Sequence, residues 1–179
     1  MAKQGVLFEE NFLDKLAGHR ILHCPRTAII ELVANSWDAG ATKVDISWPE
    51  IDSDRRFSIS DNGEGMTEEE FSKRWRTLTY DRVKEQGLYA IFPDKKTRPP
   101  RYVFGRNGLG RLAGFCFGNE YIVETKKEGY CSVFRVIRGL DQPLEIECIE
   151  RNKSQGQGTK IYTKKTLNLY MDAEDIRKE

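Results

Sequence analysis

The sequence lacks the cysteine pattern of a disulfide scaffold or a zinc site. Its 179 residues contain four cysteines, with no C-x-x-C pair and no histidine at ligand spacing. These are Cys24, Cys116, Cys131 and Cys148. We therefore expect reduced thiols in a cytoplasmic protein.

Long hydrophobic runs and an excess of charge are also missing. No window approaches eighteen apolar residues, which excludes a transmembrane helix, and residues 1–10 do not resemble a signal peptide. The net charge is +1, so charge indicates neither nucleic acid nor a membrane as a partner. Hydrophobic residues make up 39% and charged residues 32%, which is typical of one globular domain spanning 1–179. The charged stretch 171–179 suggests the N-terminal part of a larger protein.

The stretch from Glu31 to Gly40 carries the first functional signal. Glu31, Asn35 and Asp38 stand at i, i+4 and i+7, so they share one face of a helix. A carboxylate, an amide and a second carboxylate on one helix face favour a functional site. The alternative is an ordinary solvated face. The helix is expected to run from Pro25 or Arg26 to about Ala39.

A second stripe on the same helix is expected to be its buried side. It consists of Ile30, Val33, Ala34 and Trp37.

Residues 57–61 alternate as a strand and carry the second signal. Asp61 falls on the same face as the apolar Phe57 and Ile59, where a carboxylate is costly unless hydrogen-bond donors reach it. The sequence D-N-G-E-G-M follows at 61–66, and its glycines permit close backbone approach. A simple tight turn is the alternative interpretation.

A glycine-rich loop, G-R-N-G-L-G-R at 105–111, is the third signal. Such a loop presents successive N–H groups that suit phosphates, but it matches neither a Walker loop nor a Rossmann fingerprint. The preceding residues 79–102 are polar and basic without a clean period. Their length favours a functional lid, with a disordered insertion as the alternative.

The remaining chain predicts an α+β domain with helices packed over one face of a mainly antiparallel sheet. A helix is expected from an N-cap at Thr67 to Leu78. Strands are expected at 42–48, 57–61, 120–126, 131–138, 144–149 and 159–163, the last four as an antiparallel meander.

Four motifs, in this order, resemble those of the GHKL superfamily of ATPases, which includes gyrase, the ninety-kilodalton heat-shock chaperones, histidine kinases and MutL. They are E-x-x-x-N-x-x-D-A from Glu31, D-x-G-x-G-M from Asp61, G-x-x-G-x-G from Gly105 and G-T at Gly158. The run ELVANSWDAGAT at 31–42 is especially similar to MutL and MORC proteins. The resemblance covers residues 26–163 and implies the Bergerat fold, a two-layer α/β sandwich with a mainly antiparallel mixed sheet.

The resemblance also implies roles for the residues of an ATP site. Glu31 would be the catalytic base, Asn35 would bind Mg²⁺ through its amide oxygen, and Asp38 would support the pocket. Asp61, with Thr159 and a water, would bind the adenine amino group. The other implied nucleotide-binding residues are Gly63, Gly65, Met66, Gly105, Arg106, Asn107, Gly108, Leu109, Gly110 and Arg111, with Arg106 and Arg111 as phosphate contacts.

The implied function is Mg²⁺-dependent binding and slow hydrolysis of ATP to ADP and phosphate. ATP would close a lid over about 67–104 and promote homodimerisation of a larger, chaperone-like protein. In gyrase and MutL a catalytic lysine comes from a following domain, for which this chain has no room, so isolated activity is expected to be slow or absent. Two alternatives are a nucleotide-sensing module without significant catalysis and a histidine-kinase catalytic domain, which Glu31 disfavours.

Overall fold

The computed structural model describes residues 8–9, 11–49, 56–94, 96, 98–105, 107–139, 142–166 and 174. In chain order its elements are α1 (Phe12–Ala17), α2 (His19–His23), α3 (Pro25–Asp38), β1 (Val44–Ser47), β2 (Ser58–Asp61), α4 (Glu68–Arg76), α5 (Arg82–Gln86), the 3₁₀ helix η1 (Gly110–Cys116), β3 (Glu120–Lys127), β4 (Tyr130–Arg138), β5 (Leu144–Lys153) and β6 (Gly158–Tyr162).

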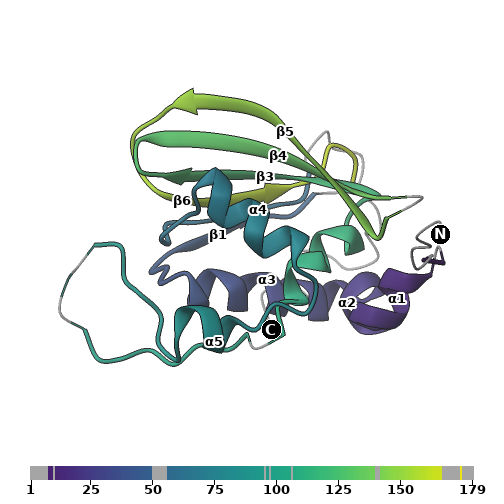
Figure 1. Ribbon diagram of the computed structural model, residues 1–179, viewed down its shortest axis with the longest axis horizontal. Coiled ribbons are helices and arrows are strands. Elements are labelled where there is room, and N and C mark those ends of the chain that lie inside the picture. The colour runs from purple at the N-terminus through teal and green to yellow at the C-terminus, as the bar shows by residue number, and fades with distance from the viewer. Residues whose placement is uncertain are drawn as a thin grey trace, which may run out of the picture.

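Helices gather on one face of a six-stranded sheet (Figure 1). Every strand pair of the described sheet is antiparallel. This arrangement confirms the predicted α+β class and the two-layer α/β sandwich. No helix in the described ranges is both long enough and apolar enough to cross a membrane.

The predicted meander is wrong in its last strand. The sheet order is β1-β2-β6-β3-β4-β5, so only β3, β4 and β5 form a meander. β6 returns to the centre of the sheet, where it pairs with both β2 and β3. Because β6 lies beside β2, its Thr159 is brought next to Asp61, which lies almost a hundred positions earlier.

Helix α3 confirms the predicted helix at its start and end. Proline is tolerated in a first helical turn, where its missing N–H has no helical partner, and α3 begins at Pro25. After Asp38 the chain leaves the helix, and Gly40 adopts a φ of 72° that favours glycine.

The predicted buried stripe of α3 is wrong. Ile30, Val33 and Trp37 are 52%, 36% and 44% exposed. The side that packs inward consists of Pro25, Ala28, Ile29, Leu32, Ser36 and Asp38. Apolar residues lie on both sides of this helix, so spacing alone could not identify the buried one. Packing against η1 decides it.

Helix α4 is held firmly at both ends. Its predicted N-cap is confirmed as a capping box, in which Thr67 and Glu70 bond each other's main-chain N–H groups. Phe71 stacks on Phe134 of β4 at 3.8 Å between ring centroids, and Trp75 donates to the Tyr121 hydroxyl at 3.1 Å. α4 is therefore part of the packed body of the domain.

Replacing Phe57 by alanine should destabilise the domain strongly. Its ring is fully buried, stacks on Phe117 at 3.7 Å and meets Trp48 edge-on at 5.9 Å. Removal of such a ring leaves a cavity and costs about 3–5 kcal/mol of unfolding free energy. Urea unfolding measures the change, with Ile46→Ala on exposed β1 as the control. A loss below about 1 kcal/mol would contradict this view of the core.

Candidate functional site

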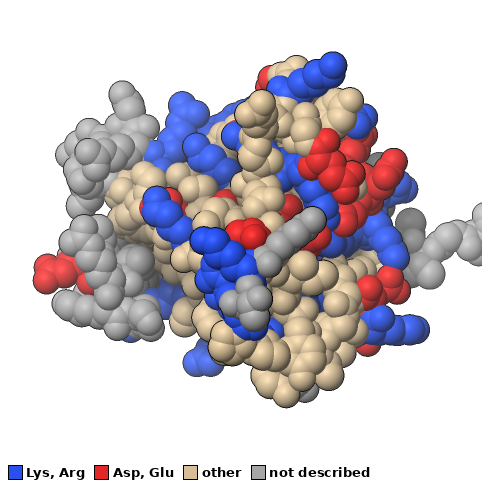
Figure 2. Space-filling model, turned by 90° about the vertical axis from the view of Figure 1, so that its left-hand side faces the viewer, with Lys and Arg blue, Asp and Glu red and all other residues tan. Residues whose placement is uncertain are grey.

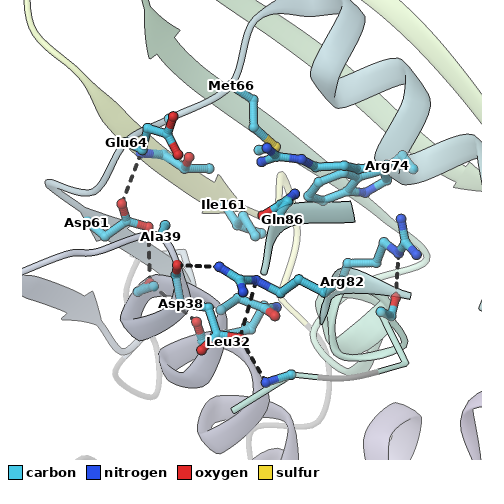
Figure 3. A pocket seen from close by; sticks show the side chains of 18 of the residues that line it. Leu32, Asp38, Ala39, Asp61, Glu64, Met66, Arg74, Arg82, Gln86 and Ile161 are labelled. Carbon is cyan, nitrogen blue, oxygen red and sulfur yellow. Dashed lines mark hydrogen bonds and ion pairs between the residues drawn. The ribbon is translucent and has the colours of Figure 1, made fainter. Parts of the chain in front are cut away.

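One pocket collects most of the predicted site residues (Figure 3). It lies between the C-terminal half of α3, strands β2 and β6, helices α4 and α5, and the glycine-rich loop. The predicted residues that line it are Asn35, Asp38, Asp61, Gly65, Met66, Gly105, Gly108, Arg111 and Thr159. Segments far apart in the sequence thus converge on one cavity.

Asp61 lies in the wall of this pocket with its carboxylate held from three directions. Oδ2 accepts from the Ser36 hydroxyl at 3.0 Å. Oδ1 accepts from the main-chain N–H groups of Gly63 at 2.8 Å and Thr159 at 3.3 Å. These donors satisfy the requirement that a carboxylate on the core side of a sheet has hydrogen-bond partners.

Burial nevertheless raises the pKa of the Asp61 carboxyl, against the opposing effect of the Gly63, Ser36 and Thr159 hydrogen bonds. A carboxylate has about four acceptor sites, so the three donors leave room for one more hydrogen bond, which a ligand with an N–H group could supply.

Two glycines shape the backbone beside Asp61. A Cβ on Gly65, which has a φ of 67°, would overlap the Lys126 carbonyl oxygen. Gly63 is buried, and its N–H bonds Asp61. Next to them Met66 is 8% exposed and donates its main-chain N–H to Thr125 at 2.8 Å. The 61–66 segment therefore lies directly against β3, with Gly65 close to the Lys126 carbonyl oxygen and Met66 bonded to the Thr125 hydroxyl.

Glu31 and Asn35 point from α3 toward the start of η1. A Cβ on Gly110 would overlap Glu31 Oε2 and lie 3.5 Å from Asn35 Nδ2. Burial raises the pKa of the half-buried Glu31 carboxyl. Glu31 is not among the residues that line the main cavity, whereas Asn35 is. A carboxylate with a raised pKa beside a pocket is a stronger base than an ordinary glutamate and is suited to accept a proton.

Gly110→Ala should therefore slow any reaction that uses Glu31. The added methyl group would displace the Glu31 carboxylate, and a displacement of about 1 Å can cost on the order of 10²-fold in rate. Ligand affinity should change far less, as measured by titration alongside single-turnover kinetics. Gly129→Ala lies on the β3–β4 hairpin with open space around it but with a φ of 81°, so it controls for the backbone strain of a glycine replacement away from the pocket. Equal rates in the two variants would contradict the assigned position of Glu31.

Asp38 is 5% exposed and bonds the main chain that precedes the glycine-rich loop. Its carboxylate accepts from the N–H groups of Phe104 at 2.7 Å and Gly105 at 2.8 Å. Arg82 of α5 adds an ion pair at 3.7 Å and donates to the Asp38 carbonyl oxygen at 2.7 Å. Asp38 thus fixes the loop against the end of α3.

The glycine-rich loop itself turns at Gly108, which has a φ of 61°. Arg111 is buried between Trp75 and Tyr80 and donates to the carbonyl oxygens of Gly108 and Thr77. Burial lowers the pKa of Arg111 to about 10.

The other predicted loop residues fall in different environments. Asn107 is exposed, Leu109 packs against the core, and Gly110 is buried at the start of η1. Arg106 lies outside the described residues.

The site also contains residues that were not predicted from the sequence, among them Ser36, Trp75 and Arg82. Ser36 continues the buried stripe of Ile29 and Leu32, so the correct stripe would have identified it. Trp75 lines the pocket from α4, and Arg82 enters it from α5. No local pattern marks Arg82, because its partner Asp38 lies 44 positions away.

A magnesium ion fits this site only together with a phosphate ligand. No group of three or more His, Cys, Asp and Glu side chains in the described ranges is placed to hold a metal. Asn35 offers a single exposed amide oxygen, and Mg²⁺ is commonly bound by one or two protein oxygens plus waters and phosphates. The donors present thus suit a metal–nucleotide complex.

Comparison with known proteins places these features in a family. A family described as histidine kinase-, DNA gyrase B- and HSP90-like ATPases matches residues 23–166. The DNA mismatch repair protein MutL of Rickettsia akari is 28% identical over 154 residues, which cover 85% of this chain and 22% of MutL. MutL of Dictyoglomus turgidum is 31% identical over 175 residues, covering 97% and 27%. The ATPase morc-1 of Caenorhabditis elegans is 29% identical over 131 residues, covering 69% and 14%. The chain spans about a quarter or less of these relatives' length. It belongs to the histidine kinase-, gyrase B- and HSP90-like ATPase family, the GHKL ATPases.

Proposed function

We propose that this domain binds ATP with Mg²⁺ and hydrolyses it to ADP and phosphate. Membership of the GHKL ATPase family supports ATP binding in general. The observation that carries the specific proposal is the partly buried Asp61 carboxylate, held by Ser36, Gly63 and Thr159 in the pocket wall. This group accepts hydrogen bonds only, which suits the amino group of adenine. Guanine carries a carbonyl oxygen at that position and should be rejected.

The opposite side of the pocket suits the phosphates. Gly105 and Gly108 line it and belong to the glycine-rich loop, and Asn35 reaches it from α3. In this proposal Asn35 holds the magnesium ion, which when bound neutralises charge on the phosphates. Glu31, one helical turn before Asn35, orients and deprotonates the attacking water.

We further propose that the mobile lid is confined to residues 77–104 of the expected range 67–104. α4 is anchored by its capping box and by Phe71 and Trp75, so it stays with the body. Most of the described residues of 77–104 are exposed, and Thr79 has an unusual φ of 57°. It is therefore the part best suited to open and close.

The domain would act as a nucleotide-controlled clamp within a larger protein. The relatives are about four to seven times the length of the matched segment, which supports further domains. ATP-dependent homodimerisation through this domain is part of the same proposal.

Calorimetric titration of the domain with Mg-ATP tests binding, and single-turnover hydrolysis tests catalysis. We expect saturable binding of ATP, no comparable binding of GTP, and slow conversion of bound ATP to ADP. Binding without conversion would favour the nucleotide-sensing alternative. Equal affinity for ATP and GTP would contradict the proposed role of Asp61.

The hydrolysis rate should fall on acidification at a pH above the ordinary pKa of a glutamate. Burial raises the pKa of Glu31, so its carboxylate is protonated, and lost as a base, at a higher pH than in an exposed glutamate. A pH–rate profile between pH 4.5 and 8 measures this limb. Circular dichroism at each pH controls for unfolding. A flat profile over the range in which the fold persists would argue against Glu31.

A further inference from the structure

Strand β5 forms one edge of the sheet and has a side that no described strand covers. Within the described ranges it pairs with β4 alone, at the end of the strand order. Figure 1 shows it as the outermost strand at the top, and none of the described helices or strands lies above it. Natural proteins commonly keep such an edge short or cover it, whereas this one is ten residues long. Its outward main-chain N–H and C=O groups are therefore available to another strand.

A groove of about 580 Å³ lies beside this edge, between β5 and α4. Phe134 of β4 contributes to its lining and is covered by Phe71 of α4, with 3.8 Å between the ring centroids. On β5 the lining includes Leu144 and Ile146, which are half-buried, and Cys148, which is exposed. These three residues alternate along the strand, so they face the same side. Helix α4 thus covers β4 and leaves an apolar channel along β5.

The same stretch of β5 is acidic. Glu145 and Glu147 alternate with the groove residues and are exposed, and no basic residue occurs from Leu144 to Glu150. On the end of the domain seen in Figure 2, acidic and basic side chains are instead interspersed. Opposite charges directly across a strand pair stabilise it, and like charges destabilise it. A strand that pairs with this part of β5 is therefore expected to carry basic residues.

We propose that β5 binds an extended segment of a partner protein in which apolar and basic residues alternate. The segment adds a further strand to the sheet. Its apolar side chains enter the groove beside Leu144 and Ile146, and its basic side chains lie beside Glu145 and Glu147. A second copy of β5 does not have this chemistry, because two antiparallel 144–148 segments centred on Ile146 would place Glu145 against Glu147. Binding at this edge does not require the proposed ATP site.

Fluorescence anisotropy of a labelled peptide, acetyl-KVKVKVK-amide, tests this proposal without nucleotide. We expect saturable binding, and binding about tenfold weaker for KKVVVKK, which has the same composition without the alternation. Successive N–H groups of a strand point to opposite edges, so N-methylation of the valines or of the interior lysines blocks one edge each. We expect one of these two methylated peptides to bind and the other to lose binding. No saturable binding of KVKVKVK, or equal binding of all four peptides, would overturn strand addition.

Variants of β5 test where the peptide binds. Ile146→Ala should weaken KVKVKVK binding by about fivefold, the upper end for a cross-strand pair. Ile149→Ala, on the same strand but outside the groove, should leave it unchanged.

Glu145→Lys should weaken binding of KVKVKVK and strengthen binding of EVEVEVE, a reversal that misfolding cannot produce. Asp45→Lys, on the opposite edge strand β1, is the charge control. If Glu145→Lys keeps the wild-type preference for the basic peptide, the proposed contact is wrong. If the nucleotide-free domain is a dimer that Ile146→Ala dissociates in gel filtration, a second copy occupies the edge and the proposed partner segment is wrong.

Discussion

Asp61→Asn is expected to abolish measurable ATP binding while leaving the domain folded. The variant keeps the shape of the side chain and one acceptor oxygen, so Gly63 and Thr159 can still donate to it. Its amide nitrogen, however, would present N–H donors where the carboxylate offered an acceptor to adenine. A lost hydrogen bond to a charged group is worth about 1.5–3 kcal/mol, and an unmatched buried donor adds to this. An affinity loss of about 100-fold or more follows.

The stability of this variant distinguishes lost recognition from lost structure. Burial raises the pKa of Asp61, so near pH 7 ionisation of this group opposes folding. Removing the charge should therefore leave the melting temperature near pH 7 unchanged or higher. Asp45→Asn, at an exposed carboxylate that pairs with Lys43, is the control for losing one charge. A folded Asp61→Asn domain that binds ATP normally would show that adenine is recognised elsewhere.

Glu31→Gln is expected to stop turnover while ATP binding stays within about twofold. Glutamine has nearly the same shape as glutamate but cannot take a proton from water near pH 7. Loss of a general base typically costs on the order of 10²–10⁴-fold in rate. Single-turnover hydrolysis measures this effect, and calorimetry under the same conditions measures binding.

Glu69→Gln, on the exposed side of α4, is the matched control because it removes one carboxylate away from the pocket. An unchanged rate in Glu31→Gln would mean that another group activates the water. Weakened ATP binding would instead indicate that Glu31 contributes to the ground-state complex.

Local patterns predicted several elements of the fold correctly. α3 begins at the proline that suits a first turn, α4 begins at the predicted cap, and strands β1 to β6 fall on the alternating segments. Each of these features depends on residues within a few positions of one another, so the sequence itself contains the information. The motif order at Glu31, Asp61, Gly105 and Gly158 likewise indicated the family that the comparisons identify.

Contacts between distant segments could not be predicted in this way. The buried side of α3 was misassigned because apolar residues lie on both sides of the helix, and only packing against η1 separates Leu32 from Val33. For the same reason Ser36 was missed as a partner of Asp61.

The sequence by itself determined which residues are available for chemistry: a carboxylate on the core side of a strand, a carboxylate and an amide on one helix face, and glycines where the backbone must turn. Tertiary structure decided which of them meet. β6 had to enter the sheet beside β2 before Thr159 could reach Asp61. The chain after α4 had to fold back onto α3 before Arg82 could reach Asp38. The physical reason is that side-chain periodicity depends on local geometry, whereas strand order and loop placement are set by burial summed over the whole chain.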